Sequence, residues 1–340
     1  MNASTITNVI GTIGSIAWAY NIVDGIIKVY SEKTYIHGKI NPVKVRNLNT
    51  KNLNINNYKD VKIKYNKDIE EFKKVLKEKL PYVDLTYLER NLQDLVINEF
   101  PTLGTPVGTY DSKNNIIGLI EDDESKSITH ELLHLSSSIY SGKRVFCGFR
   151  QRENNFSFGI CLNEAYTSIL DERIFKNSNE SYLVFRPLAQ AIETIVGKEN
   201  MEKMYFKADL NGLIHELSKY SSEDEIYKLI RNMDEIFNIF YKHNKDNIEY
   251  DEKDVYKVSV YSEECVRILT NCLITKVGEM LGENESNEQI LKFNDDFVEA
   301  ISCGYEIKNL KIKYLTQKIY DEEMNYYINN TNDLDGKKIV

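Results

Sequence analysis

Two histidines and a glutamate within one short segment carry the clearest chemical signal in this chain. The segment contains the pattern His-Glu-x-x-His at residues 130–134. On a helix, positions four apart lie one above the other, so His130 and His134 can offer two imidazole nitrogens to one metal ion. Glu131 projects beside that ion, where it can take a proton from a water molecule. The spacing therefore predicts a metal site with a general base next to it.

The residues around this pattern predict a helix with one buried side. Ile128, Leu132, Leu135 and Ile139 recur at steps of four, three and four, which gives a single apolar stripe. A helical wheel places the two histidines about 200–240° round from Ile128, roughly opposite that stripe. The alternative is an amphipathic helix with two incidental histidines, and the stripe argues against it because one side is anchored while the other is left for chemistry.

A second helix is predicted at residues 162–173. Leu162, Ile169 and Leu170 share its apolar side, and a polar side carries Glu164, Ser168 and Asp171. A catalytic zinc takes three protein ligands and leaves one position for water. Two histidines therefore need a third ligand, and a carboxylate on a nearby helix can supply it.

The pairing of His-Glu-x-x-His with the downstream Asn-Glu-Ala at residues 163–165 resembles the gluzincins, the thermolysin-like branch of the zincin metallopeptidases. The resemblance covers roughly residues 105–240 and implies a zincin-like fold. It also implies that Zn²⁺ is bound by His130, His134 and Glu164, and that Glu131 is the general base in hydrolysis of a peptide or protein substrate.

The chain departs from the thermolysin pattern at one supporting position. In that family an aspartate four residues after the ligand glutamate supports a zinc-binding histidine, whereas this chain has Ser168 there. Asp171, one turn further along, is the alternative partner. The metzincin branch fits poorly because it needs Gly and His three and six residues past the second His, where this chain has Ser137 and Tyr140.

Gluzincins also supply a His or Tyr from beyond the ligand helix to stabilise the oxyanion. The candidates here are His215, Tyr182 and Tyr205, and the sequence does not choose among them. Arg150 and Arg152 lie between the two motifs, and solvated loop positions are favoured for them over contact with substrate. The rival to a peptidase is a catalytically inactive zinc-binding module that serves partner binding or structure.

The expected fold class is α+β and predominantly helical, with a small β-sheet before the metal helix and a helical C-terminal half. Strands near residues 107–110 and 116–120 predict a β-hairpin, which either pairs with an extended substrate or is purely structural. Helices are expected at 67–80 and from Thr86 to Pro101, the second with a capping box of Thr86 and Glu89. The expected segments are an N-terminal apolar helix with short strands (1–60), a zincin-like domain (61–245) and a helical region (246–340).

Composition narrows the setting of the protein. A net charge of −9 argues against binding of nucleic acid. The five cysteines show no C-x-x-C spacing, which favours a reducing compartment and hence a cytoplasmic location. Residues 9–23 are apolar but interrupted by Asn21, so they predict a buried or surface-docked helix, with membrane contact as the minority alternative. Many Lys, Asn, Ile and Tyr residues and few prolines suggest an AT-rich bacterial source.

Overall fold

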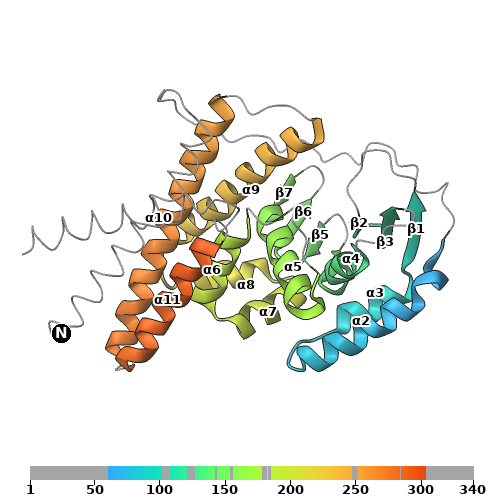
Figure 1. Cartoon of the computed structure of the whole chain (residues 1–340), viewed down its shortest axis with the longest axis horizontal. Coiled ribbons are helices and arrows are strands. Elements are labelled where there is room, and N and C mark those ends of the chain that lie inside the picture. Colours follow the sequence, from blue (N-terminus) through green and yellow to red (C-terminus); the bar gives the residue numbers. More distant parts are fainter. Residues whose placement is uncertain are drawn as a thin grey trace, which may run out of the picture.

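The computed structural model describes residues 60–100, 108–120, 127–141, 144–153, 156–177, 182, 185–246, 252–283 and 285–303. This part of the chain is mostly helical with two small sheets, so the predicted α+β class is confirmed (Figure 1). The helices are η2 (Lys62–Tyr65), α2 (Asn66–Lys79), α3 (Thr86–Gln93), α4 (Ser127–Ser136), α5 (Ile160–Phe175), α6 (Arg186–Val196), α7 (Lys198–Phe206), α8 (Leu210–Leu217), α9 (Glu223–Asp246), α10 (Glu252–Gly282) and α11 (Asn287–Cys303). The strands are β1 (Val96–Phe100), β2 (Gly108–Asp111), β3 (Ile116–Ile120), β4 (Ser138–Ser141), β5 (Arg144–Cys147), β6 (Arg150–Glu153) and β7 (Phe156–Phe158).

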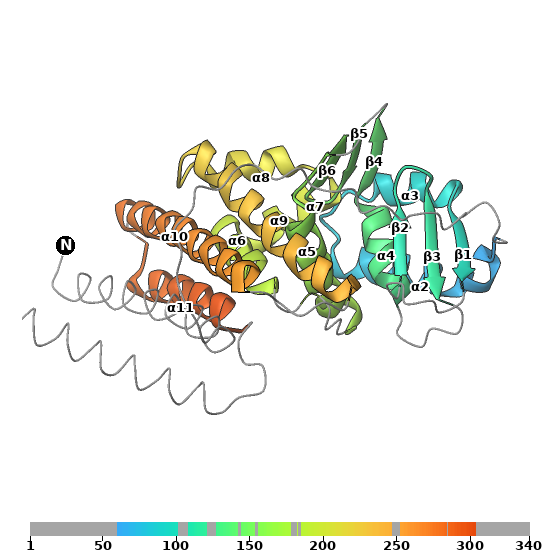
Figure 2. The same cartoon turned by 90° about the horizontal axis from the view of Figure 1, so that it is seen from above.

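The first sheet precedes α4 and has the order β1-β3-β2 (Figure 2). Strands β2 and β3 are antiparallel, with Gly108 opposite Leu119, which confirms the predicted hairpin. Strand β1 runs parallel to β3, with Ile97 opposite Ile117, and both of these side chains are fully buried. A parallel pair needs a crossover connection, so this sheet depends on contacts between distant parts of the sequence.

The region around β1 corrects two predictions. The helix that begins at Thr86 ends at Gln93, and the residues before Pro101 form β1 instead of a helix. The predicted capping box is also absent, because the Thr86 backbone N–H and hydroxyl both donate to Asp84 Oδ1, at 2.9 and 2.6 Å. The alternating apolar residues Val61, Ile63 and Tyr65 would also predict a strand, but Lys62–Tyr65 form a short 3-10 helix.

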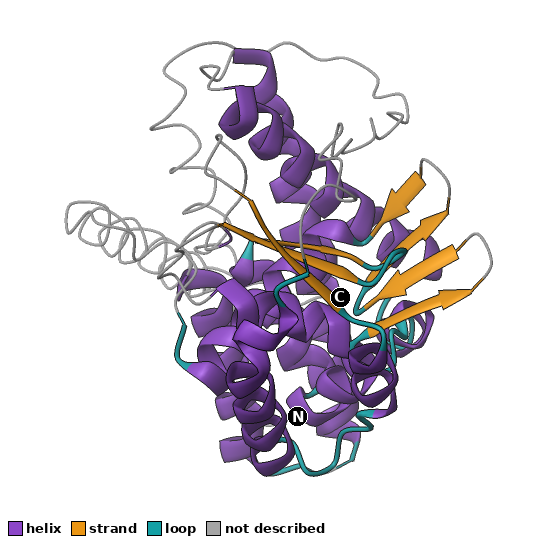
Figure 3. Cartoon of the chain, turned by 90° about the vertical axis from the view of Figure 1, so that its right-hand side faces the viewer, coloured by secondary structure: helices purple, strands orange, loops and turns teal. Residues whose placement is uncertain are grey.

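The second sheet joins α4 to α5. Four short strands follow one another as an antiparallel meander in the order β4-β5-β6-β7. The sheet holds Cys147 opposite Arg150 and Arg152 opposite Ser157. Figure 3 shows these strands on one side of the helical body. The meander returns the chain to the start of α5, so it decides how the two site-bearing helices face each other.

Helices α4 and α5 pack against each other in the centre of the molecule. On α4, Leu132 and Leu135 of the predicted apolar stripe are fully buried, and so is Leu133, which the stripe did not include. Helix α5 is buried on nearly all sides, since α4, α6 and α9 all pack against it. A helix enclosed in this way has little freedom to shift, which suits a helix that must hold a ligand at a fixed distance.

The remaining helices extend the same core. One continuous cluster of buried apolar side chains runs from Ile69 on α2 to Ile301 on α11. Helix α6 begins next to Pro187 and ends at Gly197, and the two-way capping box of Ser286 and Gln289 starts α11. Within the described ranges no helix combines the length and apolar character needed to cross a bilayer. The predicted helix at residues 9–23 lies outside those ranges, and the proposed segment boundaries stay predictions.

Candidate metal centre

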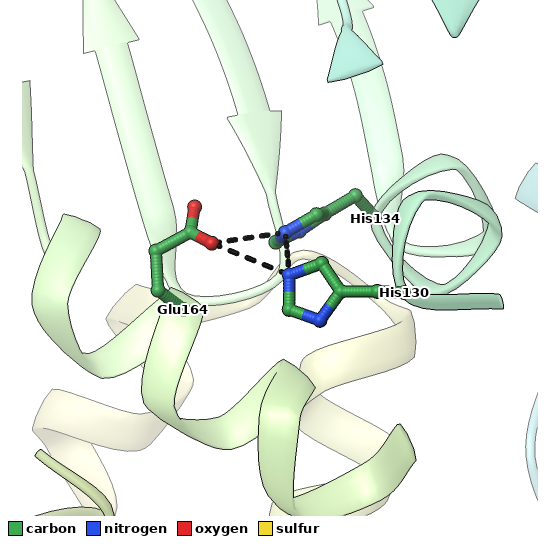
Figure 4. Close-up of side chains that lie close together, drawn as sticks. All are labelled: His130, His134 and Glu164. Atoms are coloured by element: carbon green, nitrogen blue, oxygen red, sulfur yellow. Dashed lines mark hydrogen bonds and ion pairs between the residues drawn. The ribbon is translucent and has the colours of Figure 1, made fainter. Parts of the chain in front are cut away.

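His130, His134 and Glu164 converge from two helices on one point (Figure 4). Nε2 of His134 lies 3.1 Å from Nε2 of His130 and 3.2 Å from Oε2 of Glu164. The third side of this triangle, from His130 Nε2 to Glu164 Oε2, is 3.5 Å. Both histidines are at least 94% buried. The three residues that the sequence singled out as ligands are therefore together and form a group that could hold a metal ion.

The size of the triangle can be compared with a metal coordination shell. Zinc binds imidazole nitrogen and carboxylate oxygen at about 2.0–2.2 Å, so two ligands of a tetrahedral site lie about 3.3–3.5 Å apart. The three measured separations, 3.1, 3.2 and 3.5 Å, fall near this value. Among the described residues, no fourth His, Cys, Asp or Glu joins the group. The donor set thus fits a metal with one coordination position left free.

The same three groups interact electrostatically when they hold no metal. Burial disfavours the charged forms of His134 and Glu164, but the two charges stabilise each other more strongly. The pKa of His134 is consequently held well above its usual range, and the pKa of Glu164 well below. A compact group of this kind must lose its bound proton when a cation takes the shared space, as metal ligands generally do.

His134 is supported through its second ring nitrogen. Nδ1 of His134 lies 3.2 Å from Nδ2 of Asn163, 3.4 Å from Oγ1 of Thr167 and 3.7 Å from Sγ of Cys147. The hydroxyl and the thiol can accept the Nδ1 proton that is present when Nε2 faces a metal. Asn163 and Thr167 stand four apart on α5, so a helical wheel could have placed them together, but only the fold brings them to His134.

The turn between β5 and β6 fixes this support. The backbone N–H of Phe149 donates to Oδ1 of Asn163 at 3.1 Å, and the N–H of Gly148 donates to the Ser137 carbonyl at 2.9 Å. Gly148 has φ +51°, and a Cβ at this position would lie 2.3 Å from Asn163 Oδ1 and 2.4 Å from Cε2 of Tyr205. Only glycine fits so close an approach of backbone to side chains. The turn, Asn163 and His134 are therefore locked together.

Neither of the two predicted supporting residues bonds a ligand histidine. Ser168 Oγ accepts from Nε and Nη2 of Arg186, at 3.1 and 2.7 Å. Asp171 Oδ1 accepts a hydrogen bond at 2.6 Å from the hydroxyl of Thr129, the residue that precedes His130. Nδ1 of His130 is enclosed and has no hydrogen-bond partner among the described residues. Asp171 thus acts on the position of α4, and the Ser168 difference is explained by its pairing with Arg186.

Glu131 lies where a general base is needed. Its side chain is 5% exposed, and burial raises the pKa of its carboxyl, opposed by the two neighbouring histidines. No described residue donates a hydrogen bond to this carboxylate. The carboxylate therefore lies beside the ligand group without a hydrogen-bond donor from the described part of the chain. A carboxylate of raised basicity in this place can accept and return a proton.

The three candidates for an oxyanion donor differ clearly in their positions relative to the metal ligands. The Tyr182 ring stacks on His130, with centroids 5.6 Å apart and planes at 9°, and burial and the nearby Glu164 charge hold the pKa of its hydroxyl well above its usual range. Tyr205 lies behind the site, with its hydroxyl 2.6 Å from Thr167 Oγ1, so it supports His134 indirectly. His215 is exposed on α8. Of the three candidates, only Tyr182 combines a hydroxyl donor with direct contact to a ligand histidine.

The start of α5 is fixed by a residue far along the chain. Asp234, on α9, accepts hydrogen bonds from the backbone N–H groups of Gly159 at 2.7 Å and Cys161 at 2.9 Å. A carboxylate in this position satisfies N–H groups that a helix start leaves unpaired, and it complements the helix dipole. Asp234 therefore anchors the end of α5 that carries Asn163 and Glu164.

Comparison of the chain with models of known protein families, with curated protein sequences and with solved structures gives no match.

Proposed function

We propose that this protein is a zinc-dependent peptidase of gluzincin type. The observation that carries the proposal is the triangle of His130, His134 and Glu164, which has the dimensions of a tetrahedral site with one position free. The buried Glu131 carboxylate beside it, which no described residue hydrogen-bonds, adds the base that peptide hydrolysis requires. A zincin-like fold is part of the same proposal.

When bound, zinc would polarise the scissile carbonyl and lower the pKa of a water molecule. Glu131 takes the proton of the attacking water and returns it to the leaving amine. Tyr182, whose ring stacks on His130 and whose hydroxyl is near the Glu164 charge, donates a hydrogen bond to the oxyanion that develops on the carbonyl oxygen. The Thr167 hydroxyl and the Cys147 thiol accept the Nδ1 proton of His134 and keep its ring oriented.

Strand β2 supports binding of an extended peptide. It is the edge strand of its sheet, since β3 pairs with only one of its sides, and it packs against α4. Its other row of backbone groups has no strand partner in the described part of the chain. A peptide added to that edge would gain main-chain hydrogen bonds that do not depend on its sequence. We therefore infer that the hairpin binds substrate as well as completing the sheet.

The rival, an inactive zinc-binding module, predicts a different coordination. A structural zinc site is closed by a fourth protein ligand, and the described residues offer none here. Cys147 is the nearest thiol, but it lies on the Nδ1 side of His134, away from the shared point. Four cysteines, Cys147, Cys161, Cys265 and Cys272, are buried and unpaired, which is in keeping with the reducing, cytoplasmic setting that we propose.

A mixed peptide library distinguishes the two functions. The purified full chain should cleave library members, lose activity with a chelator and regain it with added zinc. Glu131→Gln should abolish cleavage, by roughly three orders of magnitude or more, while zinc stoichiometry measured by metal analysis stays at one. Glu164→Ala should lower zinc occupancy itself. Cleavage that survives in the Glu131→Gln protein would rule out the proposed mechanism, and the absence of any cleavage by the zinc-loaded wild type would favour the inactive module.

A further inference from the structure

Arg150 lies close to the metal ligands, although the hydrolytic mechanism does not use it. The sequence favoured a solvated loop position, but Arg150 is the first residue of β6 and is half-buried. It follows directly after the turn whose Phe149 N–H binds Asn163. The backbone that carries this arginine is therefore anchored to the residue adjacent to Glu164.

The sheet register directs Arg150 toward the site. Residues opposite each other in an antiparallel pair point to the same face, and Arg150 is opposite Cys147. Cys147 lies with its sulfur 3.7 Å from Nδ1 of His134, so this is the face that looks toward α4. On the same face, Nε of Arg150 donates to Oγ of Ser157 at 2.9 Å. That hydrogen bond fixes the guanidinium plane.

The two terminal nitrogens of Arg150 are free. Among the described residues, neither Nη atom makes a hydrogen bond or an ion pair, and the side chain is only partly buried. Other arginines nearby are satisfied: Arg186 binds Ser168 and Glu172, and Arg173 binds Glu193 and Glu202. Arg150 is thus a half-buried cation whose two Nη atoms make no hydrogen bond with the described residues.

The acidic neighbours of Arg150 do not use this fork. Glu164 and Asp234 lie near enough to favour its charge. Yet Glu164 directs Oε2 at the two histidines, and Asp234 uses both oxygens to accept the backbone N–H groups at the start of α5. The two carboxylates offset the cost of burying the arginine, and they leave its outer edge for an additional anion.

We propose that Arg150 binds a carboxylate of the substrate, so that the preferred substrates are peptides with a carboxylate a short distance from the scissile bond. This inference rests on the proposed peptidase function. A guanidinium presents parallel N–H donors that match the two oxygens of a carboxylate. A peptide can bring that group either as its C-terminal carboxylate or as an Asp or Glu side chain. An arginine held beside a hydrolytic centre selects for either source by the same geometry.

Binding measurements on the zinc-loaded Glu131→Gln protein test the inference independently of turnover. The probes are N-acetyl-trialanine as acid and as C-terminal amide, and the amides of N-acetyl-Ala-Glu-Ala and N-acetyl-Ala-Gln-Ala, each titrated by calorimetry. At least one acid should bind about 10- to 100-fold more tightly than its neutral counterpart. Adding Arg150→Gln should bring that ratio close to one, and Arg150→Lys should give an intermediate ratio because it keeps the charge without the fork.

Arg144→Gln is the matched control. It removes the same charge from the same sheet, but Arg144 is exposed, points to the opposite face and pairs with Glu153. The acid preference should be unchanged in this variant. Equal binding of acids and neutral probes by the parent protein, or an acid preference that persists in a folded Arg150→Gln protein with normal zinc content, would overturn the inference. Failure of the peptidase proposal is seen separately, as the absence of library cleavage by the wild type.

Discussion

Replacing Gly148 by alanine tests whether the turn before β6 controls the metal ligand His134. The new methyl group would lie 2.3 Å from Oδ1 of Asn163 and 2.4 Å from Cε2 of Tyr205. Both neighbours are fully buried or nearly so and are held by hydrogen bonds to Phe149 and Thr167. Neither can move aside without releasing a partner, so the clash must displace the turn, the asparagine or the tyrosine.

The magnitude has two parts. A non-glycine residue in the left-handed region costs about 1–2 kcal/mol. Overpacking of a close-packed interior adds about 1–3 kcal/mol, so Gly148→Ala should lower the free energy of unfolding by about 2–5 kcal/mol. Displacement of Asn163 should also disturb the surroundings of His134 Nδ1. Changes to groups that support a metal ligand typically weaken metal affinity about 10- to 100-fold, and we expect an effect of that size.

Gly197→Ala supplies the control. Gly197 has φ +90° and ψ 135°, but nothing lies within 4 Å of a Cβ placed there, and it joins α6 to α7. Its backbone strain alone should cost about 1–3 kcal/mol. The stability losses of the two variants therefore overlap, and zinc affinity separates them: it should fall in Gly148→Ala and stay at the wild-type value in Gly197→Ala.

Two measurements suffice for this comparison. Urea denaturation of the metal-free proteins gives the free energies of unfolding. Competition with a chromophoric chelator gives the zinc dissociation constants of the folded proteins. If both variants kept wild-type zinc affinity while Gly148→Ala was destabilised, the turn would be structural only, and the argument that it positions His134 through Asn163 would be refuted.

Two further predictions concern Tyr182 and Asp234. Tyr182→Phe should lower kcat about 10²- to 10³-fold with zinc stoichiometry unchanged, because the ring still stacks on His130 while the donor to the oxyanion is lost. Peptide kinetics and metal analysis measure these two quantities. A kcat within threefold of wild type would contradict the prediction. Burial raises the pKa of Asp234 from 3.8 to about 7, and the charge of Glu235 acts in the same direction. The two backbone N–H donors and the charge of Arg150 oppose this rise. Between these two pH values the folded chain holds a proton on Asp234 that the unfolded chain has released. The resulting contribution to the free energy of unfolding is full below pH 3.8 and is lost as pH rises through 7. The loss is about 2–3 kcal/mol between pH 5 and 8. Asp234→Asn should remove that part of the pH dependence in urea denaturation, and identical pH profiles for the two proteins would exclude a raised pKa.

The features that the sequence predicted well are those set by local spacing. His130 and His134 lie on one helix face because of a four-residue interval, and the apolar stripe of α4 follows the same periodicity. The antiparallel hairpin of β2 and β3 was similarly visible, since its two runs are separated by a polar turn. Glu164 was identified through its resemblance to a known pattern, and the fold places it 3.2 Å from His134.

The features that the sequence missed depend on contacts between distant residues. Strand β1 looked like the end of a helix because leucines in helical spacing lead into it, and only its pairing with β3, about twenty residues away, makes it a strand. Arg150 was read as a loop cation because its burial arises from the register of β5, β6 and β7. Asp234 gave no signal as the residue that anchors α5, because its partners precede it by more than seventy positions.

The departure at Ser168 has a physical explanation in this fold. Arg186 brings two nitrogens to the Ser168 hydroxyl and one to its backbone carbonyl, and it also pairs with Glu172. A carboxylate at position 168 would therefore meet this guanidinium before it met a histidine. The role of orienting a ligand is carried instead by the Thr167 hydroxyl on the same helix and the Cys147 thiol on β5, and Asn163 packs beside them near Nδ1 of His134. A helix that turns a different pair of side chains toward the metal can keep the same three ligands, so the metal group and its supporting residues can change independently.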